Sequence, residues 1–254
     1  MFAQPGTVLT GYIHYRMVLG VTGKALTSFG SSKEFVAAVR DTLTAHARAY
    51  EDAKILHCDV GPANIIITHD GGILIGWGFC RRLLTDDGPG SAAILLDQTK
   101  PQGRIDDLEP FLHVLSWVTL RYLDNTMNTL ARATYLSKTF DEARIENGIA
   151  SGGEHKELHS VGDAYILAKL TFKKTSSLSN LLREIAAVFR WRYAEIPEKE
   201  RHSFTRIQNH MEQGTLLHTA LELLMSVSSV AMQNLADASW LLDPLNRHLF
   251  PTVE

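Results

Sequence analysis

The amino-acid sequence predicts a mainly α-helical domain of the α+β class that contains one small β hairpin. Several long segments place apolar residues at steps of three and four, which is the spacing of one face of a helix. Two short runs rich in isoleucine flank an Asp-Gly-Gly sequence, which is typical of a hairpin turn. Strands and helices do not alternate along the chain as they do in proteins with a parallel sheet.

The composition of this 254-residue chain fits a globule with a buried core, because 45% of its residues are hydrophobic and 21% are charged. The formal net charge of -3 does not indicate a basic surface, so we expect no nucleic-acid partner. No apolar run approaches the roughly 18 residues of a membrane span, so we expect no membrane association. These features favour an intracellular protein, either cytoplasmic or nuclear.

The cysteines and histidines do not indicate a metal site. The two cysteines, Cys58 and Cys80, do not form a Cys-x-x-Cys pair, which argues against a disulfide framework or a zinc knuckle and fits a reducing compartment. Among the eleven histidines, His155 and His159 are four residues apart, but they lack the glutamate of a zinc-protease motif. We therefore assign no metal ligands to them.

The first elements are a short β segment over Tyr12–Leu19, a glycine-punctuated turn at 20–23 and a long helix. The helix begins at Ser31, because Ser31 and Glu34 have the spacing of a capping box. It runs to about Lys54. One face of this helix is apolar, and its members are Val36, Val39, Leu43, Ala47 and Tyr50.

The hairpin and a central helix follow. The sequence predicts strands over Ile65–Thr68 and Ile73–Ile75, joined by a turn at 69–72. Residues 82–104 contain many turn formers and predict a long irregular loop. From Asp107 to Leu123 apolar residues cover most of the helix circumference, so we expect this helix in the middle of the domain.

Beyond Asp124 the sequence predicts helices with one break at 147–153. Residues 178–193 and 215–235 carry leucine, isoleucine and valine at helical spacing. No internal repeat is present.

The segment between the first helix and the hairpin contains the pattern that carries chemistry. His57, Asp59 and Asn64 follow the spacing His-x-Asp, four residues, Asn, and a hydrophobic strand follows at once. This segment resembles the catalytic loop of protein kinases. In such a loop the aspartate accepts the proton of the attacking hydroxyl group, and the asparagine turns its amide oxygen toward a magnesium ion.

Three segments together resemble the fungal-type protein kinase family, namely Leu56–Ile67, Ile73–Gly78 and Asp106–Trp117. The family reads roughly Leu-His-Arg-Asp-Ile-Ser-x-x-Asn-Ile-Leu, then Leu-Ile-Asp-Trp-Asp, then Asp-Asp-Leu-Glu-Ser-Phe-x-x-Val-Leu. The resemblance covers roughly residues 14–123 well and the remainder loosely. It implies the C-terminal lobe of a protein-kinase-like fold.

The resemblance implies a role for each matched residue. Asp59 would be the catalytic base, and Asn64 would be a catalytic residue that binds the cofactor, ATP with magnesium. His57 would be structural, packing inward and bonding to the backbone. Asp107 would also be structural, holding the catalytic-loop backbone from the start of the central helix, and Asp106 is the weaker candidate for this anchor.

The sequence departs from the family where metal and phosphate would bind. Gly76 stands at the position of the metal-binding aspartate, and glycine offers magnesium no side-chain oxygen. Cys58 replaces the arginine between the histidine and the aspartate. No Gly-rich loop precedes this region, and neither Lys24 nor Lys33 lies in a Val-Ala-Ile-Lys-like strand. Asp59 would then be a vestigial base, and the binding of ATP and magnesium rests on the resemblance alone.

We interpret residues 1–254 as a single kinase-like C-terminal lobe that lacks most of the N-terminal lobe. Residues 1–30 would form a hinge-like remnant, 31–123 the catalytic-loop core and 124–254 a helical remainder. The implied function is that of a truncated or catalytically impaired pseudokinase that acts by binding a protein.

Two alternatives stay open. One is an active ATP-dependent Ser/Thr protein kinase, a phosphotransferase, whose N-terminal lobe is supplied by a longer transcript or by another chain. The other is an apolar surface, on the face that the N-terminal lobe covers in kinases, that recruits a partner or self-associates.

Overall fold

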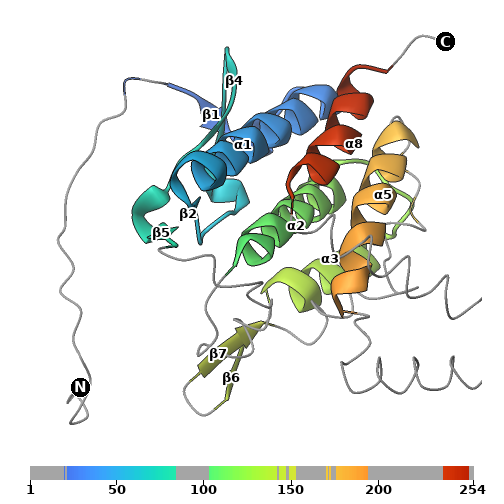
Figure 1. Ribbon diagram of the computed structural model, residues 1–254. Helices are drawn as coiled ribbons and strands as arrows, with labels where there is room; N and C mark the ends of the chain where they lie inside the picture. The colour runs from blue at the N-terminus through green and yellow to red at the C-terminus, as the bar shows by residue number, and fades with distance from the viewer. Residues whose placement is uncertain are drawn as a thin grey trace, which may run out of the picture.

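The computed structural model describes residues 20, 22–83, 103–141, 143–146, 149–152, 170, 172, 176–193 and 237–251. Helices predominate among them, and the strands form three small antiparallel sheets (Figure 1). The predicted class, mainly α with a small β component, is confirmed. The strand expected at Tyr12–Leu19 and the helical pattern at 215–235 lie outside the described residues.

Helix α1, Ser32–Ala53, begins and ends where the sequence predicts. The Ser31 hydroxyl oxygen accepts a hydrogen bond from the Glu34 backbone N–H at 3.1 Å, which satisfies one of the amides that a helix start leaves unpaired. The Glu34 carboxylate accepts from the Gly30 backbone N–H at 2.5 Å, one residue before the position that a capping box requires. Lys54 follows the helix in the left-handed region, at φ 55°, and ends it.

The predicted hairpin is present, but its turn is shorter than expected. Strands β3, Ile65–Thr68, and β4, Gly71–Leu74, pair so that Thr68 lies opposite Gly71, and only two residues connect them. The prediction of a four-residue turn at 69–72 is therefore wrong. Strand β1, Lys24–Ala25, pairs with the other edge of β3.

The close approach of β4 to α1 explains why two glycines belong to the strand. A Cβ atom at Gly72 would lie 2.1 Å from the Ala38 backbone oxygen, which is far inside the van der Waals limit. The Asp41 carboxylate on α1 also accepts a hydrogen bond from the Gly72 backbone N–H at 3.0 Å. Glycine at this position lets the strand lie directly on the helix.

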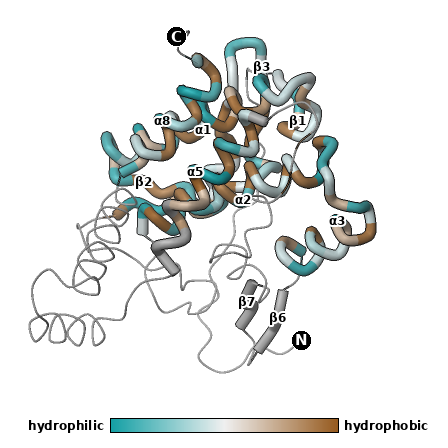
Figure 2. Tube along the Cα trace, turned by 90° about the vertical axis from the view of Figure 1, so that its right-hand side faces the viewer, coloured by the Kyte–Doolittle hydropathy of each residue, from teal (hydrophilic) through white to brown (hydrophobic). Residues whose placement is uncertain are grey.

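Helix α2, Arg104–Tyr122, occupies the centre of the described structure, as predicted. It packs against α1, against α3 (Thr129–Leu136) and against α5 (Ser176–Tyr193), and α8 (Ser239–Leu249) packs on α1 and α5 (Figure 1). Figure 2 shows apolar stretches gathered where α1, α2, α5 and α8 meet. No described helix is long and apolar enough to cross a bilayer.

The prediction for the C-terminal half is wrong at one place. Strands β6, Ala143–Glu146, and β7, Ile149–Gly152, form an antiparallel hairpin where the sequence predicted one break between helices. The register pairs Glu146 with Ile149, and the sequence between them is Asn-Gly, the pair that favours a tight hairpin turn. A short π-helical turn, Ser137–Asp141, connects this hairpin to α3.

Candidate functional site

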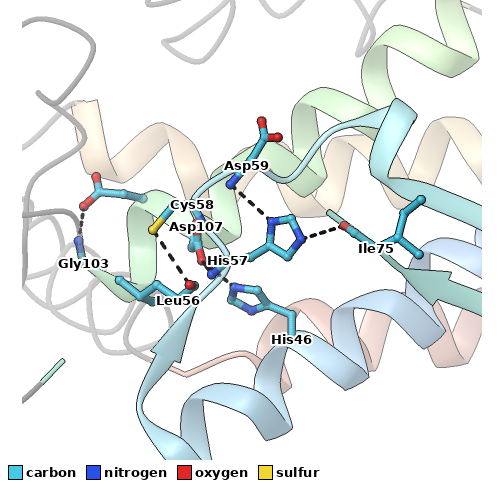
Figure 3. A network of polar contacts seen from close by, with 9 residues as sticks. His46, Leu56, His57, Cys58, Asp59, Ile75, Gly103 and Asp107 are labelled. Atoms are coloured by element: carbon cyan, nitrogen blue, oxygen red, sulfur yellow. Dashed lines mark hydrogen bonds and ion pairs between the residues drawn. The ribbon is translucent and has the colours of Figure 1, made fainter. Parts of the chain in front are cut away.

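The candidate site is the loop between β2, Ile55–Leu56, and β3. Strand β2 pairs antiparallel with β5, Arg81–Arg82, and the loop ends in a short 3-10 turn, Pro62–Asn64. Both ends of the loop are therefore held by strand pairing. The side chains of His57, Cys58 and Asp59 extend from the backbone of this loop (Figure 3).

The carboxylate of Asp107 anchors this loop from the first turn of α2. Asp107 is completely buried, and its Oδ2 accepts hydrogen bonds from the His57 backbone N–H at 2.5 Å and from Nε2 of His46 at 2.8 Å. Its Oδ1 accepts from the Cys58 backbone N–H at 2.9 Å (Figure 3). Because a buried carboxylate is costly unless it is hydrogen-bonded, these donors are what make its position favourable. Asp106 instead accepts from the Gly103 backbone N–H at 2.6 Å, at the helix start.

The His57 side chain is fully buried and bonds only to groups near it in the loop and hairpin. Its Nε2 lies 2.9 Å from the Ile75 carbonyl oxygen, and its Nδ1 accepts from the Asp59 backbone N–H at 3.2 Å. Since a carbonyl oxygen can only accept, the ring proton lies on Nε2. The ring also packs edge-on against Trp77, with 4.6 Å between centroids. His57 thus ties the loop to the end of β4.

Asp59 and Asn64 lie together at the exposed end of the loop. The Asn64 Nδ2 group donates to the Asp59 backbone oxygen at 2.7 Å and to the Asp59 carboxylate at 2.9 Å. Figure 3 shows the Asp59 carboxylate pointing away from the buried His46 and Asp107 side chains. The structure therefore brings the two residues proposed for catalysis into direct contact on one surface. Their roles as base and cofactor ligand remain predictions.

Gly76 follows β4 in the left-handed region, at φ 84°, and faces the Asn64 side chain. A Cβ atom at Gly76 would lie 2.4 Å from Asn64 Oδ1 and 2.6 Å from its Cγ. The Ile75 backbone N–H donates to the Asn64 carbonyl oxygen at 2.8 Å, which fixes this contact. The asparagine amide occupies the space that a side chain at position 76 would use.

The residues present do not fit a bound magnesium ion. Magnesium requires several oxygen ligands in octahedral geometry, and Gly76 supplies none. The Asn64 Oδ1 atom lies 2.4 Å from the place that a Cβ at Gly76 would occupy, while its Nδ2 group is hydrogen-bonded to Asp59. In the part of the chain that the structure describes, no group of three or more His, Cys, Asp or Glu side chains is arranged to hold a metal ion. The set of magnesium ligands that the family resemblance predicts is therefore incomplete in the described residues.

Trp77 and Phe79 belong to a short 3-10 turn, Trp77–Phe79, after Gly76. The Trp77 indole N–H donates to the Leu74 carbonyl oxygen at 2.9 Å, so this tryptophan fastens the turn to β4. Phe79 is 67% exposed and is one of four large apolar side chains that are exposed among the described residues. The site therefore has a fixed polar part and an apolar side chain beside it.

Cys58 is the second residue of the loop and lies in the left-handed region, at φ 63°. Burial, together with a smaller effect of the negative charge of Asp107, raises the pKa of its thiol to about 11. At neutral pH the side chain is therefore protonated. It cannot supply the positive charge of the arginine that the family carries at this position.

The sequence interpretation assigned no role to His46. His46 is fully buried on α1, three residues after Leu43 on the apolar face, and it binds Asp107 across the core. In the sequence, His46 stands out as a polar residue on an otherwise apolar helix face. Its partner, Asp107, cannot be identified from this pattern because it is distant along the chain.

The family model described as fungal protein kinase matches residues 7–119. These residues match the fungal protein kinase family. The resemblance suspected from the motifs is thus confirmed, and the match includes the loop, the hairpin, Gly76 and Asp107. A comparison with curated proteins finds no match. We call residues 7–119 the kinase-like segment. The match shows which family this segment resembles, and it does not show whether the segment is catalytically active.

Proposed function

We propose that the kinase-like segment belongs to a pseudokinase, a catalytically impaired domain of the fungal kinase type that acts by binding a protein. The observation that carries this proposal is the contact between Gly76 and Asn64. The position of the metal-binding aspartate holds glycine, and the Asn64 amide fills the adjacent space. A carboxylate is thus missing where phosphoryl transfer requires charge stabilisation of the phosphate by metal.

The lysine pattern supports the same conclusion. Lys24, at the start of β1, forms an ion pair with Glu34 at 2.9 Å on the surface. Lys24 is therefore engaged in the cap of α1. Each tenfold in rate corresponds to about 1.4 kcal/mol of barrier, and the loss of the metal carboxylate removes charge stabilisation that is worth several such factors.

The retained scaffold supports a binding role. The bonds from Asp107 to His46, His57 and Cys58 stabilise the loop conformation without taking part in chemistry. They hold Asp59 at the surface, and Phe79 is exposed on the turn whose Trp77 packs against His57 of the loop. A rigid loop that presents one acid, next to a turn that presents one large apolar side chain, is suited to contact with another protein.

The alternative is an active Ser/Thr protein kinase, and one observation favours it. The Asp59 carboxylate is exposed, and Asp59 occupies the sequence position that the kinase motif gives to the catalytic base. Such an enzyme would need its N-terminal lobe, with the phosphate-binding lysine, from elsewhere. It would also need Asn64 to rotate away from Asp59.

Thermal shift and phosphoryl transfer separate the two functions. We expect ATP to leave the melting temperature unchanged, both with and without magnesium, and we expect no transfer of labelled phosphate to a generic Ser/Thr substrate. A ligand at 100 times its dissociation constant would stabilise the fold by about 2.7 kcal/mol, which a melting curve detects. A magnesium-dependent rise in the melting temperature, together with transfer that Asp59→Asn abolishes, would overturn the pseudokinase proposal.

A further inference from the structure

The only two cysteines of the chain lie at the same place in the fold. Cys58 follows β2 and Cys80 precedes β5, and these strands pair antiparallel with Leu56 opposite Arg81. One further step along this register would place His57 opposite Cys80. Both cysteines are free thiols, and Cys80 is exposed while Cys58 is half-buried.

The Cys58 side chain points back along the strand pair. Its Sγ atom lies 3.8 Å from the Leu56 carbonyl oxygen (Figure 3). It is also close enough to the Arg81 backbone N–H for that group to stabilise its thiolate. The Arg81 nitrogen is bonded directly to the carbonyl carbon of Cys80. The N–H group beside the Cys58 sulfur therefore belongs to the residue that directly follows the second cysteine.

The strand geometry matches the needs of a disulfide. Opposed Cα atoms in an antiparallel pair are about 4.5–5.5 Å apart, so Cα atoms one residue out of register are about 6 Å apart, which is within the roughly 4.4–6.8 Å that a disulfide joins. Cys58 and Cys80 stand on opposite sides of the end of this ladder, one residue out of register. Cys80 is exposed, next to the turn at Trp77–Phe79, and closing the bond requires its side chain to turn toward Cys58.

We propose that Cys58 and Cys80 form a reversible disulfide when a peroxide oxidises the protein, so that this pair is a redox modification site. The bond closes a loop that contains Asp59, Asn64 and Gly76. It fastens the kinase-like loop to β5 at the position where the family carries an arginine. The proposal is independent of whether the segment transfers phosphate.

The chemistry balances with one peroxide for each disulfide. Cys80 releases its proton and the exposed thiolate attacks one oxygen of hydrogen peroxide, so that the O–O bond breaks, the thiolate becomes a sulfenic acid, and the departing hydroxide takes up the released proton as water. The Cys58 sulfur then attacks the Cys80 sulfur, the S–S bond forms and the S–O bond breaks. The hydroxide leaves with the proton of Cys58 as a second water. A reducing thiol reverses the reaction through a mixed disulfide.

Peptide mapping of the full chain tests the proposal. Digestion with trypsin and with a protease that cleaves before aspartate separates the two cysteines into peptides Ile55–Cys58 and Asp70–Arg81. After hydrogen peroxide and then N-ethylmaleimide, we expect these peptides joined under non-reducing conditions and separate after dithiothreitol. In an equal mixture of 15N-labelled and unlabelled chains, each joined pair should carry a single isotope composition.

Two variants serve as controls. Cys58→Ser should remove the joined peptide and let the Cys80 sulfenic acid accumulate, which dimedone labels. Cys80→Ser should remove the joined peptide and leave Cys58 as the free thiol. Joined pairs of mixed isotope composition would overturn the proposal, because the bond would then link two chains. Conversion of wild-type Cys80 to its sulfinic acid while Cys58 stays alkylatable would overturn it as well.

Discussion

Asn64 occupies the space beside Gly76 that any side chain at position 76 would need. A Cβ atom there would lie 2.4 Å from Asn64 Oδ1, and Gly76 has a φ of 84°, where side chains are strained. The asparagine is held by its bonds to Asp59. The loss of the carboxylate and the placement of Asn64 are therefore one structural feature, and a single substitution at position 76 does not restore a metal site.

Replacement of Gly76 by aspartate should destabilise the protein and leave it without metal-dependent nucleotide binding. The new side chain meets Asn64 and forces a left-handed backbone, so we expect a loss of about 1–3 kcal/mol in the free energy of unfolding. Urea denaturation measures this loss. Gly78→Asp is the matched control, because nothing lies within 4 Å of a Cβ at that glycine. Equal stability of the two variants would mean that Asn64 moves aside freely.

Replacement of Asp107 by alanine should be among the most damaging single changes in the described core. It leaves the His57 and Cys58 backbone N–H groups and the His46 side chain without their buried acceptor. We expect a loss of about 3–5 kcal/mol in the free energy of unfolding. Asp106→Ala is the control.

The Asp106 variant removes a bond to the Gly103 N–H at the helix start and should cost about 1 kcal/mol. Chemical denaturation of both variants gives the comparison. If the two substitutions cost the same, Asp107 does not anchor the loop. The prediction concerns stability only, so it holds whether or not Asp59 acts as a base.

Replacement of Gly72 by alanine should separate β4 from α1. The added methyl group would lie 2.1 Å from the Ala38 backbone oxygen, and helix backbone cannot yield as a flexible side chain does. We expect a loss of about 1–3 kcal/mol in the free energy of unfolding, the range for overpacked cores. Gly61→Ala, where a Cβ meets nothing within 4 Å, should be nearly neutral. A melting temperature for Gly72→Ala equal to that of Gly61→Ala would contradict this account.

Local signals predicted most of the described elements. Ser31 and the apolar face of α1 gave its limits, and the continuous apolar surface of the 107–123 segment placed α2 at the centre. The turn of the first hairpin was predicted too long, because glycines were taken as turn residues. Gly72 instead belongs to the strand, where it is needed because the backbone of the distant Ala38 lies so close. The second hairpin was missed because its Asn-Gly signal was taken as a break between helices.

The candidate site was predictable in its residues but not in its contacts. The spacing of His57, Asp59 and Asn64 identified the loop, since these residues are close in sequence. Spacing could not show that Asn64 donates to Asp59 and fills the space at Gly76. The bond from His46 to Asp107 joins two helices, and such long-range pairs leave no periodic signal in one sequence.

The raised pKa of Cys58 should make the stability of the fold depend on pH in the alkaline range. Burial raises the thiol pKa from 9.0 to about 11 in the folded state, so above pH 9 the unfolded chain gives up this proton more readily. The contribution of the protonated Cys58 thiol to the stability of the fold is complete below pH 9 and is lost as the pH rises through about 11. Unfolding free energies measured by urea denaturation between pH 8 and 11 should therefore fall with pH.

The decrease of the unfolding free energy with pH that is due to Cys58 should be absent from the Cys58→Ser variant and present in the Cys80→Ser variant. Because only the thiolate reacts, alkylation of Cys58 by iodoacetamide in the folded protein should quicken about tenfold for each pH unit up to its pKa. Mass spectrometry of the Ile55–Cys58 peptide follows the reaction site by site. An alkylation rate for Cys58 that levels off near pH 9 would show that burial does not protect this thiol.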